Sequence, residues 1–218
     1  MSKPAVELLV LDVHGVVLSD HLPKFFEEFA VRTGERVDDV RRRWRKGIRT
    51  PAWKGEIDDE ELWRRLTGGG AHRWRELLEA GYQLGPAAPH LARWSARVPI
   101  WLLSNHRTGW LLPRLRRFGI YDLFDQVLVS DVIGAAKPDA GAFALIGEHV
   151  GQPQAALFVD DQTCNVEAAR RLGLRAVHAA GPTDWIATVD AYLDSVIEES
   201  PRGAIATNAA SAQNAPVS

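Results

Sequence analysis

Short runs of apolar residues recur along the chain, separated by stretches with helical spacing. Five runs of four to six residues are typical of parallel strands buried on both faces; they cover residues 6–11, 98–103, 126–129, 155–159 and 175–178. Between the later runs, the spacing predicts helices over 108–118, 140–150 and 166–172, and Gly119, Gly151 and Gly173 follow them as expected stops. Strands and helices that alternate with short connections predict a parallel sheet covered on both faces.

The pattern changes between residues 20 and 85, where it predicts helices alone. Phe25, Phe26, Phe29 and Ala30 share one helical face, and glycine-rich breaks at 68–70 and 81–89 separate the later helices. We therefore predict an α/β protein: a Rossmann-like parallel sheet of five or more strands with an inserted helical cap domain. Residues 1–18 and 86–200 are expected to form the core, 19–85 the cap, and 201–218 a disordered tail because they are small and polar.

Composition and charge exclude several classes of protein. With 218 residues, 46% of them apolar, the chain can build a full core, and its net charge of −2 argues against a general nucleic-acid binder. The single cysteine, Cys164, excludes an intrachain disulfide and fits a reducing compartment. No apolar run approaches the ~18 residues of a membrane-spanning helix, and residues 1–4 lead into the first strand without a signal-peptide pattern. We expect a cytoplasmic protein that binds neither nucleic acid nor membranes.

Carboxylates follow two of the predicted strands directly. Asp12 comes after the first strand, and Asp160 and Asp161 come after the fourth. Because open α/β folds bind ligands at the carboxyl ends of their strands, we expect these side chains to meet. Asp12 is placed to attack phosphorus and form an acyl phosphate, and the three carboxylates together suit Mg²⁺. Taken alone, a strand-end aspartate such as Asp12 is most often a turn residue, and Asp160–Asp161 could be an acidic helix start.

Polar and cationic groups complete the predicted site. Ser104 and Asn105 follow the second strand and offer donors for phosphate oxygens, and Lys137 supplies a fixed positive charge beside the nucleophile and the phosphoryl group. Taken singly, Ser104–Asn105 is a common helix cap, and Lys137 before a proline carries no signal. The order of all four motifs, in register with the strands, favours a phosphoryl-transfer site.

These motifs resemble the haloacid dehalogenase-like (HAD) hydrolase superfamily, subfamily I. They read LLVLDVHGVVL, IWLLSN, AAKPDAGAF and LFVDDQTCNVEAARRLG, and the likeness extends to about residue 195. The insertion is similar to that superfamily's C1 helical cap. Residues 54–63 are similar to the cap of the branch that includes the phosphatase domain of soluble epoxide hydrolases and small bacterial sugar-phosphate phosphatases.

The resemblance implies a role for each matching position. Asp12 is expected to be the nucleophile, and the backbone carbonyl of His14 a ligand of Mg²⁺. Asp161 is the firmer metal ligand of the acidic pair, with Asp160 nearby, and Asn165 supports the metal and phosphate site. The departure is His14, which stands where phosphatases of this design carry a second aspartate as general acid/base.

Two interpretations of His14 stay open. A histidine has a reference pKa of ~6.5, which suits acid/base work, although its ring is larger than a carboxylate and it is cationic when it acts as the acid. Alternatively, His14 lends only its backbone carbonyl and dephosphorylation is slow. Other residues at this place accompany transport ATPases, phosphonate hydrolases and dehalogenases, and Lys54 is a conceivable Schiff-base lysine for a phosphonate hydrolase.

The predicted cap carries a cationic and aromatic segment. Residues 41–55 include seven basic residues and no acidic one, with Trp44 and Trp53 interleaved. One interpretation is a lid over an anionic substrate, with Arg45, Arg49 and Lys54 contacting it. The other is a solvated helix face with its tryptophans on the buried side.

Together these features predict a Mg²⁺-dependent phosphohydrolase that acts on a small phosphorylated metabolite, a phosphate monoester, through an aspartyl-phosphate. The alternatives are a phosphotransferase or a binding protein with impaired turnover, both suggested by His14; a phosphonate hydrolase or a 2-haloacid dehalogenase is supported less well. The residues predict neither the substrate nor the oligomeric state.

Overall fold

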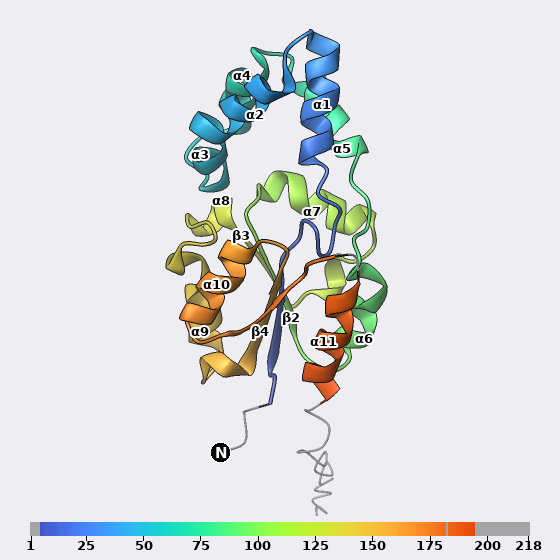
Figure 1. Cartoon of the computed structure of the whole chain (residues 1–218), viewed down its shortest axis with the longest axis vertical. Coiled ribbons are helices and arrows are strands. Elements are labelled where there is room, and N and C mark those ends of the chain that lie inside the picture. Colours follow the sequence, from blue (N-terminus) through green and yellow to red (C-terminus); the bar gives the residue numbers. More distant parts are fainter. Residues whose placement is uncertain (1–4, 182, 195–218) are drawn as a thin grey trace, which may run out of the picture.

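The central strand of the sheet is β1 (Leu8–Leu11), and the predicted nucleophile, Asp12, directly follows it. A computed structural model describes residues 5–181 and 183–194. Its five parallel strands have the order β3-β2-β1-β4-β5 (Figure 1); they are β1 Leu8–Leu11, β2 Ile100–Ser104, β3 Gln126–Val129, β4 Ala156–Asp160 and β5 Arg175–His178. The predicted α/β class and parallel sheet are confirmed.

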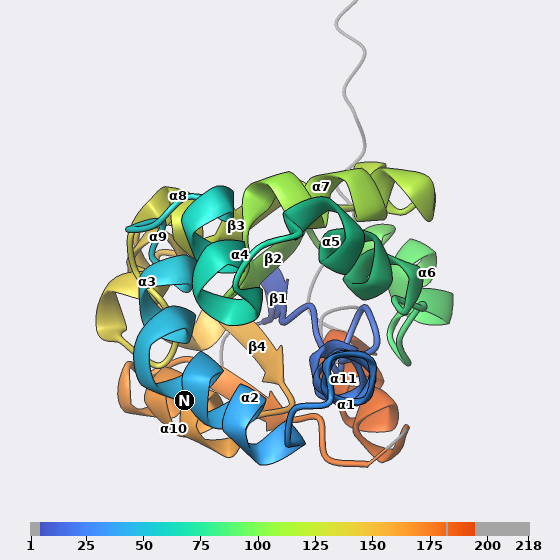
Figure 2. The same ribbon diagram turned by 90° about the horizontal axis from the view of Figure 1, so that it is seen from above.

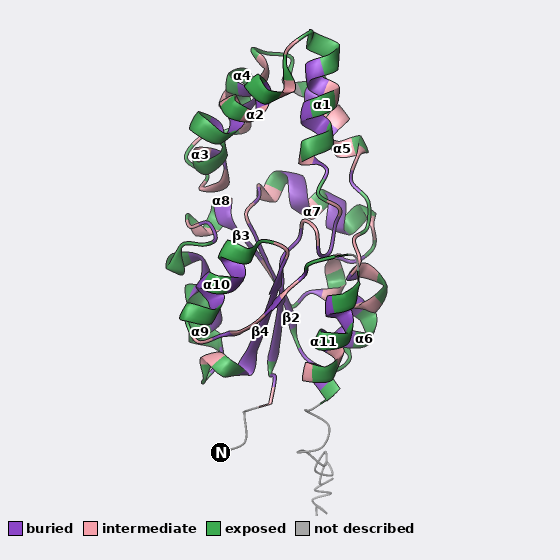
Figure 3. Cartoon of the chain, in the orientation of Figure 1, coloured by how far each residue is buried: buried purple, intermediate pink, exposed green. Residues whose placement is uncertain are grey.

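Helices cover both faces of this sheet, which explains why the strands read as continuous apolar runs. On one face, Leu8 and Val10 pack with side chains from α9 (Ala144–His149) and α10 (Thr163–Arg171). On the other, Leu9 and Leu11 pack with α6 (Leu91–Ser95), α7 (Thr108–Arg117) and α11 (Asp184–Asp194). Figure 3 shows the strands buried between helices whose outer surfaces are exposed. Successive strand residues therefore point into two separate apolar layers.

Three details of the core differ from the sequence prediction. The helix expected over 140–150 begins as a 3-10 turn, Ala140–Phe143, and continues as α9 to His149. Gly119 and Gly173 adopt the left-handed conformation just past their helices, whereas Gly151 does not. Helices α6 and α11 and the short α8 (Ser130–Ile133) were not predicted. The predicted tail, 201–218, lies outside the described residues.

Five α-helices form the cap between β1 and β2. They are α1 Leu22–Thr33, α2 Val37–Arg43, α3 Arg49–Trp53, α4 Asp59–Thr67 and α5 Ala71–Ala80, with a π-helical turn, Trp44–Ile48, between α2 and α3. Aromatic rings build the inside of the cap: Phe25 packs on Trp63, and Phe29 lies edge-on to Trp74. Figure 2 shows the cap helices arranged around the strand ends when the molecule is viewed from above. No helix within residues 5–181 and 183–194 is long and apolar enough to cross a membrane.

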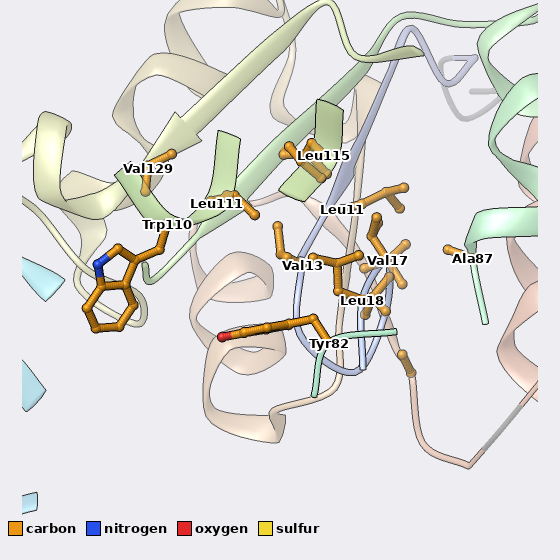
Figure 4. Close-up of a cluster of buried hydrophobic side chains, with 14 of the residues drawn as sticks. Leu11, Val13, Val17, Leu18, Tyr82, Ala87, Trp110, Leu111, Leu115 and Val129 are labelled. Atoms are coloured by element: carbon orange, nitrogen blue, oxygen red, sulfur yellow. The ribbon is translucent and has the colours of Figure 1, made fainter. Parts of the chain in front are cut away.

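Two neighbouring segments carry the chain from the core to the cap and back. They are joined by backbone hydrogen bonds, from the Ser19 N–H to the Gln83 carbonyl at 2.9 Å and from the Gly85 N–H to the Val17 carbonyl at 2.8 Å. Gly85 must lack a side chain, because a Cβ there would lie 2.6 Å from the Val16 carbonyl oxygen. Val17 and Leu18 anchor the crossing in the core (Figure 4).

Candidate active site

The ends of two neighbouring strands, β1 and β4, bring the predicted carboxylates together. Asp12 follows the central strand β1, and Asp160 ends the neighbouring strand β4. Oxygen atoms of Asp12, Asp160 and Asp161 all lie within 4.8 Å of one another. Asp12 and Asp160 are buried, and Asp161 is half-buried. The sheet topology thus concentrates three negative charges in a region with little water.

Lys137 partly compensates these charges. Its ammonium donates to Asp12 Oδ1 and to Asp160 Oδ2, each at 2.7 Å, and its side chain is 1% exposed. Burial alone would lower the pKa of Lys137, but the two carboxylates outweigh that effect and raise it. Burial also raises the pKa of Asp12 to about 7, with Lys137 opposing the rise and Asp160 adding to it. Lys137 is therefore a fixed cation in contact with the predicted nucleophile.

The two carboxylates of the acidic pair have different surroundings. Asp160 accepts hydrogen bonds from the Gln162 N–H at 2.8 Å and from the Asn165 amide at 3.0 Å to each oxygen, in addition to Lys137. Asp161 has a buried oxygen, Oδ1, without a hydrogen-bond partner among the described residues. Burial and the charge of Asp160 raise the pKa of Asp161 to about 6. Asp160 therefore orients Lys137, and Asp161 keeps a free acceptor.

This arrangement fits a divalent cation. Three carboxylates and one ammonium leave a formal charge of −2, which one Mg²⁺ would neutralise. The unpartnered Asp161 Oδ1 and the cluster of hard oxygen atoms are the donors that Mg²⁺ prefers. Asp12 and Asp161 are the side chains that would hold the ion.

The second motif lies beside Lys137 and is joined to its loop. The Asn105 amide donates to the Lys137 carbonyl at 2.7 Å, and the Lys137 N–H donates to Asn105 Oδ1 at 2.8 Å. Ser104 is buried at the end of β2, and its Oγ has no hydrogen-bond partner among the described residues. Asn105 therefore fixes the Lys137 loop and lines the cavity between core and cap, whereas the structure does not place Ser104 among the residues that line it.

His14 lies in the same cavity as Asp12, on the loop that leaves β1. Its ring stacks on His106 with centroids 4.8 Å apart, and its Nε2 is buried without a hydrogen-bond partner in the described structure. Burial, followed by the charges of His106, Arg114 and Lys137, lowers the pKa of His14 well below its usual value. The ring is therefore neutral at neutral pH, which is the form that can accept a proton, although the same shift weakens it as a base.

Gly15 gives the His14 loop its path. Its φ is +77°, and a Cβ at this position would lie 2.5 Å from Asp161 Oδ2. Only glycine combines that backbone conformation with so close an approach. The glycine of the first motif therefore allows the His14 loop to lie against the acidic pair.

A cavity of about 190 Å³ opens above these groups, between core and cap. Its floor includes Asp12, His14, Lys137 and Asp161, and cap residues, among them Arg49 and Trp53, form part of its wall. The wall is largely aromatic; its rings belong to Trp44, Trp53, Tyr82, His106 and Trp110. Cap residues therefore form part of the wall above the acidic cluster.

The basic segment of the cap divides between the two interpretations given above. Of the three cations expected to contact the substrate, Arg49 lines the cavity, and the structure does not place Arg45 or Lys54 there. Lys54 pairs with Asp139 at 3.2 Å. Arg41, Arg42 and Arg43 pair with carboxylates of the cap. Most of this segment is thus solvated surface held by ion pairs, and Arg49 is its candidate for substrate contact.

Residues 6–173 match the sequence model described as haloacid dehalogenase-like hydrolase. This chain belongs to that family. It is 30% identical over 195 residues to Phosphatase MT3486 of Mycobacterium tuberculosis, covering 79% of this chain and 86% of the relative. It is 28% identical to the phosphoglycolate phosphatase of Escherichia coli K12, covering 72% and 63% respectively. The HAD family enzyme bt-2542 of Bacteroides thetaiotaomicron, in complex with magnesium and inorganic phosphate, has a similar fold, with a TM-score of 0.66, 18% identity and coverage of 84% and 99%.

Sequence reasoning did not assign several residues that line this cavity, including Tyr82, His106 and Trp110. His106 and Tyr82 both line the cavity, and the Tyr82 hydroxyl lies 3.5 Å from His106 Nε2. Burial raises the pKa of Tyr82 to about 12 and lowers that of His106 to about 3. Figure 4 shows the Tyr82 hydroxyl pointing away from the neighbouring aliphatic cluster. The one available signal was the position of His106, directly after the Ser104–Asn105 motif.

Proposed function

We propose that this HAD hydrolase is a Mg²⁺-dependent phosphohydrolase that acts on a small phosphate monoester through an aspartyl-phosphate at Asp12. The observation that carries the proposal is the buried cluster in which Lys137 joins Asp12 to Asp160, with Asp161 beside them, at the end of the central strand. The phosphatase names of the relatives support the reaction. The magnesium and phosphate bound by bt-2542 support the cofactor.

In the first step, an Asp12 carboxylate oxygen attacks phosphorus, a P–O(carboxyl) bond forms and the bond from phosphorus to the leaving oxygen breaks. Lys137, 2.7 Å from Asp12, stabilises the negative charge of the transferring group. The Asn105 segment binds phosphate oxygens. A bound Mg²⁺ would supply further charge neutralisation between carboxylate and phosphate. Asp161, with its unpartnered oxygen, would hold it together with Asp12 and the His14 carbonyl.

In the second step, water hydrolyses the acyl phosphate and restores the Asp12 carboxylate. The water must lose a proton, and the neutral His14 ring lies in the same cavity with Nε2 unpartnered. His14 is therefore the proposed base of this step. Its lowered pKa leaves little of the protonated ring available to protonate the leaving group, which accordingly depends on a proton from water or on its own low pKa. We therefore expect phosphate esters with good leaving groups to react fastest.

The substrate that we propose is a small, anionic phosphate ester. The cavity of about 190 Å³ is enclosed by the cap, and Arg49 is the cap cation on its wall. A small phosphorylated metabolite fits such a space, with Arg49 near the part of the ester that lies outside the phosphate.

The test is a panel of phosphorylated metabolites assayed with Mg²⁺ and with EDTA. We expect release of phosphate from a subset of the panel, full loss in EDTA, and recovery when Mg²⁺ is restored. Asp12→Asn should abolish turnover and remove the acid-stable phosphoenzyme that rapid quenching traps in the wild type. Asp139→Asn, a change of an exposed aspartate, serves as the matched control. Turnover of Asp12→Asn above a few per cent of wild type would exclude the covalent mechanism. Release of halide from a 2-haloacid, assayed separately in EDTA, would favour the dehalogenase alternative.

A further inference from the structure

Three rings form a continuous stack from the cap to the acid/base position. Trp53, the last residue of α3 in the cap, stacks on His106 with centroids 5.5 Å apart and planes 18° apart. His106 stacks in turn on His14, at 4.8 Å and 23°. We call Trp53, His106 and His14 the ring stack. All three line the cavity, and each comes from a different part of the chain.

The middle ring is fixed by the core. The His106 backbone N–H donates to Ser130 Oγ at 3.0 Å, and its Nδ1 lies 2.9 Å from the Arg107 carbonyl. A carbonyl can only accept, so Nδ1 carries the proton and Nε2 is an acceptor facing the Tyr82 hydroxyl at 3.5 Å. Burial lowers the pKa of His106 to about 3, which keeps the ring neutral. His106 is thus a rigid, uncharged plate, 1% exposed.

The two outer rings depend on this plate in different ways. His14 Nε2 has no hydrogen-bond partner among the described residues, so ring contacts rather than that nitrogen set its orientation. Trp53 reaches the plate from the cap and is held there by its neighbours. The guanidinium of Arg107, the residue after His106, donates to the carbonyls of Ala52 at 3.2 Å and Ile57 at 2.8 Å, on either side of Trp53. Within the core dipeptide His106–Arg107, Arg107 therefore holds the cap segment around Trp53, and His106 supports the ring of His14.

We propose that His106 is a positioning residue that holds the His14 ring toward the reacting phosphate, and that Trp53 completes the support when the cap lies on the core. The faces of His106 are both covered by neighbouring rings, so it is not a free platform for a substrate ring. The rings of Trp53 and His106 therefore serve to order the side chain of His14 rather than to bind a ring of the substrate. This inference rests on the proposed function of His14 as the base that assists hydrolysis of the acyl phosphate.

The first test is a double-mutant cycle between His106 and His14. His106→Ala should lower kcat by at least about ten-fold with little change in KM, because a misplaced base slows the chemical step. His106→Phe keeps a flat ring and should recover most of kcat. In a His14→Ala background, His106→Ala should have no further effect on kcat, since its action passes through His14. His90→Ala, which removes a histidine stacked on Trp94 outside the cavity, is the matched control.

Several outcomes would overturn the proposal. A His106→Ala defect that persists undiminished in the His14→Ala background would mean that His106 acts by another route. The same holds if His106→Phe is as slow as His106→Ala, or if the loss appears only in KM.

A second measurement does not depend on turnover. In the proton NMR spectrum, the chemical shifts of the His106 and His14 ring protons depend on ring currents from the neighbouring rings, so they report whether the stack is formed. Trp53→Leu should move the His106 resonances directly and those of His14 through a change in its ring orientation, whereas Trp74→Leu, in the interior of the cap, should move neither. Unchanged histidine resonances in Trp53→Leu would refute the stack even if the enzyme is an active phosphatase. Shifted resonances in a protein without phosphatase activity would refute the proposed function and retain the stack.

Discussion

Replacing Lys137 with methionine tests how the buried cluster is balanced. The lysine side chain is 1% exposed and bonds two carboxylates that are themselves at most 7% exposed. Methionine has a similar length without the charge, so Lys137→Met fills the space but leaves Asp12 and Asp160 facing each other without a cation. The perturbation is therefore electrostatic rather than a loss of packing.

The magnitude follows from burial. Removing one partner of a buried ion pair typically costs about 3–5 kcal/mol, because the remaining charge is left uncompensated. An exposed pair contributes only about 0–1 kcal/mol. Lys54→Met, which breaks the partly exposed contact with Asp139, is therefore a matched control within the same chain. We expect Lys137→Met in EDTA to lose several times more unfolding free energy than Lys54→Met.

The loss of stability in Lys137→Met should depend on pH, and the pKa of Asp12 determines the direction of that dependence. Lys137 opposes the rise in the pKa of Asp12, so its removal raises that pKa further above the wild-type value of about 7. The unfolded carboxyl has a pKa of about 3.9, so the folded state binds more protons between the two values. Stability contributed by the protonated group is therefore lost as pH rises through the folded pKa. The deficit of Lys137→Met should be smallest at pH 5 and largest at pH 8.

Urea denaturation in EDTA at both pH values measures these differences directly. Added Mg²⁺ should restore part of the lost stability at pH 8, because a cation binding only the folded state stabilises it. Equal stability of Lys137→Met and wild type at pH 8 in EDTA would refute the electrostatic account. A deficit that is the same at pH 5 and pH 8 would mean that the lysine acts by packing.

Three further predictions address metal, substrate and cap. Asp161→Asn should weaken Mg²⁺ binding by at least ten-fold, on the order of a lost charged ligand, as measured by activation curves, and saturating Mg²⁺ should recover part of the rate. Arg49→Gln should raise KM by about ten-fold if its charge contacts substrate, while Arg45→Gln, outside the cavity, leaves kinetics unchanged; equal effects would remove the assignment. Asp59→Asn should raise KM and lower the unfolding midpoint in urea, because Asp59 accepts from Arg107 at 2.6 Å and Trp110 at 2.8 Å across the boundary between cap and core; unchanged values of both would mean that the cap is held by other contacts.

Much of the fold could be predicted because local patterns of apolar residues indicate the individual strands and helices. The strands are buried on both faces and therefore read as short continuous apolar runs, and the spans 126–129 and 175–178 coincide with β3 and β5. Helix α11 is harder to recognise. It follows the last strand without a functional motif to mark it, and it becomes evident only because Trp185 and Val189 are buried against the rest of the core.

The floor of the site was also accessible from sequence, since parallel strands end at one edge. Asp12, Ser104 and Asp160 follow strands, and that rule brings them together without any knowledge of side-chain contacts. The cap residues follow no such rule. Arg45 and Arg49 are one helical turn apart and equally basic, yet only Arg49 lines the cavity. Residues one turn apart share a helix face. Arg45 lies in the π-helical turn Trp44–Ile48 and Arg49 begins α3, so the position of each residue along the cap decides which one reaches the cavity.

The sequence alone also does not determine the protonation state of His14. A reference pKa of ~6.5 suits either acid or base catalysis, and the sequence contains nothing that selects one. The selection comes from burial beside His106, Arg114 and Lys137, residues roughly 90 to 120 positions away, all of which lower the pKa. Burial is the largest cause, because it penalises the charged ring, and the positive charges of Arg114 and Lys137 oppose protonation further. The tertiary structure therefore keeps the ring neutral, and it does so through burial and through core residues that are distant from His14 in the sequence.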